Sequence, residues 1–98
     1  MVLAICVNDN GKPNEIPANK WIKKNRVYEV DWIGVLNNGQ YNVHLKEPVL
    51  DPESCFPYTG FSVNRFRFSK KSDDQVSTEL IEELIGDIGV RKDGGPTN

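Results

Sequence analysis

Hydrophobic and polar residues alternate over short stretches of this 98-residue chain, as they do in β-strands. Residues 2–7 form a continuous apolar run of strand length, which is typical of a strand buried on both faces. Residues 27–33 and 41–45 alternate, and Asn37, Asn38 and Gly39 between them form a tight-turn signature. The pattern predicts a β-hairpin over residues 27–46, with Tyr28, Val30 and Trp32 on one face of its first strand.

A further strand is predicted near residues 65–68, where Phe66 and Phe68 would point inward and Arg65 and Arg67 outward. Before it, residues 47–60 contain three prolines, which exclude a central strand and predict a long loop. Several short strands, one hairpin and this late strand together predict a mainly β fold, a small barrel over residues 1–70.

The end of the chain shows a different, helical periodicity. Ser72 and Gln75 match a capping box, and apolar residues follow at helical spacing: Val76, Leu80, Ile81, Leu84, Ile85 and Ile88. This predicts an amphipathic C-terminal helix within residues 71–89 and a flexible tail over residues 90–98. The apolar stripe, with Leu80 and Leu84 at its centre, either docks on the barrel or binds a second copy or a foreign protein.

Lys24, Asn25 and the following Tyr28 and Val30 resemble the Lys-Gly-x-x-Tyr-x-Val opening of many SH3-like barrels, with Asn25 in place of the glycine. More closely, residues 1–68 resemble a group of uncharacterised small proteins of bacteriophages and Bacteroides-type bacteria. The pieces that carry this resemblance are residues 4–9, 16–17, 20–24, 27–30 and 61–66. The resemblance implies an SH3-like barrel and no assigned activity. Its phage context implies a protein that binds and regulates a host protein.

Charge is unevenly distributed along the chain. Residues 12–71 hold ten Lys or Arg and six Asp or Glu, whereas residues 72–98 hold two and seven. Two interpretations stay open, ordinary surface charge or a basic binding face beside an acidic tail. The basic face would contain Trp21 and the cations Lys23, Lys24, Arg26, Arg65 and Arg67.

Catalytic and metal-binding constellations are not evident in the sequence. The single histidine, His44, falls on the polar face of its strand and is expected to be solvated. Cys55 could pair with it as a nucleophile, but no third residue is indicated to orient the pair. Asp51 and Glu53 are expected to be exposed loop acids. We therefore expect no enzymatic activity, no cofactor and no metal.

The sequence therefore predicts a non-catalytic binding protein, cytoplasmic and without a membrane-spanning segment. Its expected partner is a protein, including a second copy of itself. The alternative is a single-stranded nucleic acid held by Trp21 and the surrounding cations, in which aromatic rings stack on bases and cations hold phosphates. The overall pI of about 5.3 favours the protein partner.

Overall fold

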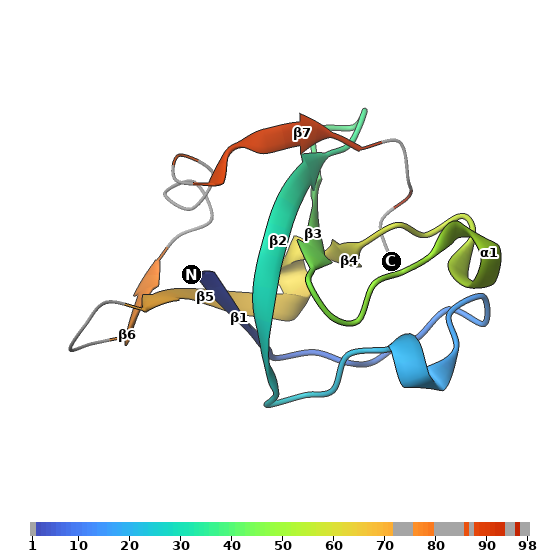
Figure 1. Ribbon diagram of the computed structural model, residues 1–98, viewed down its shortest axis with the longest axis horizontal. Coiled ribbons are helices and arrows are strands. Elements are labelled where there is room, and N and C mark those ends of the chain that lie inside the picture. Colours follow the sequence, from blue (N-terminus) through green and yellow to red (C-terminus); the bar gives the residue numbers. More distant parts are fainter. Residues whose placement is uncertain (1, 72–75, 80–85, 87, 94–95, 97–98) are drawn as a thin grey trace.

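The computed structural model describes residues 2–71, 76–79, 86, 88–93 and 96 (Figure 1). Its strands are β1 (Val2–Cys6), β2 (Val27–Val35), β3 (Tyr41–Leu45), β4 (Phe61–Ser62), β5 (Phe66–Lys71), β6 (Val76–Glu79) and β7 (Val90–Lys92). Helical structure in this part of the chain is short: α1 (Pro52–Cys55) and the 3-10 turns Ala18–Lys20 and Val63–Arg65. Gly86 and Ile88, within the predicted C-terminal helix, are also helical. The prediction of a mainly β fold is confirmed.

The strands form one sheet in the order β4-β3-β2-β1-β5-β6, with each neighbouring pair antiparallel. Strand β7 lies outside this path and pairs in parallel with the second half of β2. The long strand β2 crosses the molecule and pairs first with β1 and then with β3 (Figure 1). Among the described residues, β4 and β6 do not pair with each other, so the sheet is open rather than a closed barrel.

A β-bulge at Asp31 divides β2 into two halves. The pairing with β3 shifts between Val30 and Trp32, so one extra residue stands on β2. Since side chains alternate along a strand, the extra residue inverts every later position. Val30 and Ile33 therefore both face the core, whereas Trp32 faces the opposite side of the sheet. The prediction that Tyr28, Val30 and Trp32 share one face is wrong for Trp32.

The hairpin turn confirms the prediction from the asparagines and glycine. Gly39 has a positive φ of 85°, its N–H donates to the Leu36 carbonyl, and the Leu36 N–H donates to Gln40. Asn25 also has a positive φ, 72°, a conformation that asparagine adopts more readily than most other residues with a Cβ.

The hydrophobic core lies on the inner face of the sheet and beneath two loops. It consists of Ala4, Cys6, Ile16, Ile22, Val30, Ile33, Val43, Leu45, Leu50, Cys55, Phe61, Phe66 and Phe68. Phe66 and Phe68 point inward as predicted, and the proline-rich loop contributes Leu50 and Tyr58. Phe56 of the same loop is 74% exposed and does not pack on the sheet.

The C-terminal region differs from the predicted helix and tail. Residues 76–79 form β6 on the edge of β5, so the helix prediction is wrong there, and Leu80 and Leu84 lie outside the described residues. β-branched Val76 and Thr78 favour a strand once β5 offers an open edge. Residues 90–92 form β7 and Asp93 is buried, where a flexible tail was expected. No helix in the described part of the chain is long and apolar enough to cross a membrane.

Candidate binding groove and C-terminal docking site

Trp21 is held in place on three sides. Its indole Nε1 donates to the Asp9 carbonyl at 2.7 Å, and its ring tilts against Phe61 with the centroids 5.7 Å apart. The Arg65 guanidinium lies over the ring, 4.8 Å from its centroid. The indole is half-buried and fixed in orientation, so it forms a rigid wall for whatever lies beside it.

Two surface hollows meet at Trp21. The first, of about 400 Å³, is lined by Ala18, Asn19, Trp21, Lys23, Arg26, Tyr28, Glu47 and Pro48. The second, of about 460 Å³, is lined by Asp9, Asn10, Gly11, Lys12, Ala18, Trp21, Ile22 and Lys23. Because Ala18, Trp21 and Lys23 belong to both, the hollows are neighbours. We call the pair the Trp21 groove.

The groove contains part of the predicted basic face. Trp21, Lys23 and Arg26 line it, and the two cations are exposed. Tyr28 also lines it, and its hydroxyl accepts a hydrogen bond from the Lys23 N–H at 2.8 Å. Lys24 is exposed but lines neither hollow, and its backbone N–H donates to the Asp9 carboxylate at 3.0 Å.

Arg65 and Arg67 do not form the predicted pair of outward cations. Arg67 is exposed on β5, as expected. Arg65 instead lies in the 3-10 turn before β5, where its Nη1 donates to the carbonyls of Asn8 and Asn10 at 3.2 and 2.6 Å. Burial lowers the pKa of the Arg65 guanidinium. Strand β5 begins at Phe66, one residue later than the alternation predicted, so Arg65 precedes the strand. Its guanidinium contacts both the loop after β1 and the Trp21 ring.

A second site lies at the opposite end of β2 and was missed by sequence reasoning. His44 Nε2 lies 2.6 Å from the Asp93 carboxylate, and both side chains are nearly buried. The other Asp93 oxygen accepts from the Thr59 hydroxyl at 2.9 Å, and Asn42 Nδ2 lies 3.4 Å from Oδ2. The prediction of a solvated His44 is wrong, because the C-terminal segment covers the polar face of β3.

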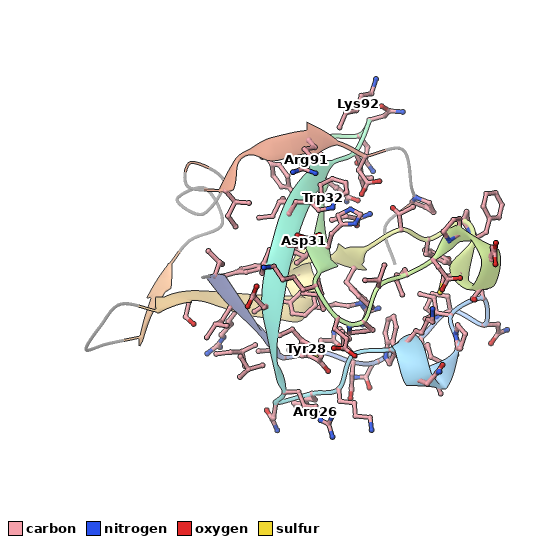
Figure 2. All side chains as sticks on the ribbon, in the orientation of Figure 1. Arg26, Tyr28, Asp31, Trp32, Arg91 and Lys92 are labelled. Atoms are coloured by element: carbon pink, nitrogen blue, oxygen red, sulfur yellow. The ribbon has the colours of Figure 1, made fainter. Side chains whose placement is uncertain are left out.

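Aromatic and cationic side chains extend this cluster. The Trp32 and His44 rings stack nearly parallel, 3.6 Å apart with an interplanar angle of 6°. The Arg91 guanidinium lies over Trp32, 5.3 Å from its centroid. Figure 2 shows the two side chains next to each other. Arg91, Trp32 and His44 therefore form successive layers beside the Asp93 carboxylate.

Two glycines make room for the cluster. A Cβ on Gly34 would lie 2.5 Å from Asp93 Cβ, far inside contact distance. A Cβ on Gly60 would lie 3.1 Å from the His44 ring. We call the space bounded by Gly34, Asn42, His44 and Thr59 the Asp93 slot.

The other candidate chemical groups have structural surroundings. Burial raises the pKa of the Cys6 and Cys55 thiols, which lowers their thiolate fraction at neutral pH. Asp51 pairs with Lys20 and accepts hydrogen bonds from the Ser54 N–H and hydroxyl at 3.1 and 2.8 Å. The Lys20 ammonium and these bonds lower the Asp51 pKa to about 2, so Asp51 caps α1 as a carboxylate.

No family model matches this chain, and no significant match to it was found among the curated proteins or the solved structures.

Proposed function

We propose that this chain is a non-catalytic binding protein that holds an extended segment of a protein partner in the Trp21 groove. The observation that carries the proposal is the meeting of two hollows at a fixed tryptophan. The apolar surfaces of Trp21, Tyr28 and Pro48 would take side chains of the partner. The groove carries charges of both signs, so Lys23 and Arg26 would pair with acidic residues of the segment, and Asp9 and Glu47 with basic ones.

A protein segment suits the groove better than a single-stranded nucleic acid. Stacked bases need an open aromatic face, and Arg65 already covers one face of Trp21. Two carboxylates, Asp9 and Glu47, also line the groove and would repel phosphates. The alternative function remains nucleic-acid binding through the predicted residues Trp21, Lys23, Lys24, Arg26, Arg65 and Arg67. It is supported by the exposure of the four cations other than Arg65.

The biological setting proposed for this activity follows from the resemblance of residues 1–68 to small phage proteins. Such a protein would act by occupying a surface of a host protein, without catalysis or a cofactor. The same resemblance supports an SH3-like arrangement of the strands within residues 1–70, with the sheet left open between β4 and β6.

Ala18 provides a sharp test, because it is exposed and lines both hollows. Ala18→Trp fills the groove without removing a core contact. Asn14→Trp is the matched control, since Asn14 is exposed and lines neither hollow. Each tagged protein is incubated with lysate of the source organism, half of it treated with nuclease, and retained proteins are identified by mass spectrometry.

We expect the unmodified chain and Asn14→Trp to retain the same protein from both halves, and Ala18→Trp to lose it. Retention that survives Ala18→Trp would place the binding surface elsewhere. Capture that disappears after nuclease treatment would favour the nucleic-acid alternative. Its affinity should then fall steeply with salt, because phosphate contacts release counterions.

A further inference from the structure

Strand β7 joins the sheet as an added strand rather than as part of its antiparallel path. Ile33, Gly34 and Val35 of β2 stand opposite Val90, Arg91 and Lys92 in parallel register. The ladder continues one residue further, where the Asp93 N–H donates to the Val35 carbonyl at 2.9 Å. This is the geometry by which an extended peptide extends a sheet, with main-chain hydrogen bonds supplying affinity.

Alternate side chains of this strand are recognised individually. Arg91 and Asp93 are two residues apart, so they lie on the same side of β7, where Arg91 covers Trp32 and Asp93 enters the slot. Lys92 between them is exposed and points away from the sheet, as Figure 2 shows. The docking surface therefore distinguishes an Arg-x-Asp sequence on an extended strand.

Three of the groups that hold the Asp93 carboxylate come from outside β7. His44 and Asn42 of β3 and the Thr59 hydroxyl bring hydrogen-bond donors to one point, which suits a carboxylate. Gly34 leaves space for a backbone at close range. Asp93 is only 5% exposed in this slot, so the enclosure is nearly complete.

We propose that the Asp93 slot and the adjoining edge of β2 form a binding site for an extended Arg-x-Asp segment of a partner protein, and that β7 occupies this site as an internal competitor. The site shares no residue with the Trp21 groove, so the proposal does not depend on the function assigned to that groove. A tethered competitor lowers the apparent affinity for any free segment of the same chemistry. Weakening β7 should therefore open the site.

The experiment uses the full chain and a fluorescein-labelled peptide with the sequence of residues 88–98, followed by fluorescence anisotropy. In the variant Asp93→Ala the internal strand loses its carboxylate, and we expect the peptide to bind at least about tenfold more tightly than to the unmodified chain. Arg91→Ala, at an exposed position, should give a smaller gain in the same direction. The matched control is Lys92→Ala, which should behave as the unmodified chain.

Specificity is tested with a second peptide that carries Asn in place of Asp93, which should bind the Asp93→Ala variant at least about tenfold more weakly than the first peptide. Equal affinity for the two peptides would overturn the proposal, because the slot would then not distinguish a carboxylate from an amide. It would also be overturned if neither variant gained affinity over the unmodified chain. Should Asp93→Ala fail to fold, Arg91→Ala is used in its place, both for the comparison with the unmodified chain and for the comparison of the two peptides.

Discussion

Replacing Gly34 by Ala should expel Asp93 from its slot. The new Cβ would lie 2.5 Å from Asp93 Cβ and 2.7 Å from its Oδ2. Gly34 is not among the positive-φ residues, so alanine fits its backbone conformation without strain. The whole effect should therefore come from contact with Asp93. Either the two strands move apart or the Asp93 side chain leaves its hydrogen-bond partners.

The two routes give similar magnitudes. Forcing extra atoms into a packed region costs about 1–3 kcal/mol. Losing a hydrogen bond to a charged group, such as the contact between Asp93 and His44, costs about 1.5–3 kcal/mol. We therefore expect Gly34→Ala to lower the free energy of unfolding by about 2 kcal/mol, which corresponds to a fall in Tm of roughly 10 °C for a domain of this size.

A double-mutant cycle with Asp93→Gly isolates the contact, measured by urea denaturation followed by circular dichroism. Asp93→Gly removes the Cβ and carboxylate that alanine would meet. In that background Gly34→Ala should cost less than about 0.5 kcal/mol. The reasoning would be refuted if Gly34→Ala cost the same in both backgrounds, because the loss would then not arise from Asp93.

Gly39 supplies the matched control for this cycle. It has a φ of 85° and no atom within 4 Å of a Cβ built on it. Gly39→Ala should cost about 1–2 kcal/mol through left-handed backbone strain alone. That cost should be the same with and without Asp93→Gly, because the two positions share no contact.

Two further predictions concern the charged residues Arg65 and Asp51. Arg65→Ala should lower the free energy of unfolding, measured in urea, by about 1–3 kcal/mol, because two hydrogen bonds to carbonyls and the contact with Trp21 are lost. Arg67→Ala, at an exposed position, should change it by less than about 0.5 kcal/mol. Equal effects of the two substitutions would contradict the structural role of Arg65. Asp51 has its pKa lowered from 3.8 to about 2, so its ion pair with Lys20 stabilises the fold above pH 3.8 and is lost as the pH falls towards 2. Asp51→Asn should therefore lower Tm at neutral pH, and the difference should shrink as the pH falls from 3.8 to 2 in thermal melts; a difference as large at pH 2 as at neutral pH would contradict the ion pair.

Local patterns predicted the parts of the fold that depend on neighbouring residues. Alternation over residues 65–68 predicted that Phe66 and Phe68 point inward, and both are buried in the core. The turn at Gly39 followed from the need for a positive φ. In each case the physical cause lies within a few residues, so the sequence carries it directly.

The C-terminal strands could not be predicted in the same way. The spacing of apolar residues from Val76 onward fits a helix, but it contains no information about the open edge of β5, with which residues 76–79 pair. Whether residues 76–79 form a helix or a strand depends on that partner, which is decided by the rest of the fold. The same holds for β7, whose place is set by the second half of β2.

The His44 site shows which signal was available and which was not. Alternation correctly placed His44 on the face of β3 opposite the core, but its partner Asp93 is 49 residues away along the chain. A glycine inside a strand often marks a place where another segment approaches closely. Gly34 was such a signal, since it lies beside Asn42 in the hairpin and leaves space for Asp93.

The bulge at Asp31 explains why this small chain presents two separate sites along one strand. Before the bulge, Tyr28 stands opposite the buried Ala4, and its ring reaches the Trp21 groove. After the bulge, Trp32 lies on the other face and stacks on His44. Without the extra residue, strict alternation would direct Trp32 to the face of Tyr28, and the layer that Arg91 covers would not exist. The layer of Trp32 and His44 therefore depends on this one irregularity of β2, and the two sites use different faces of the sheet.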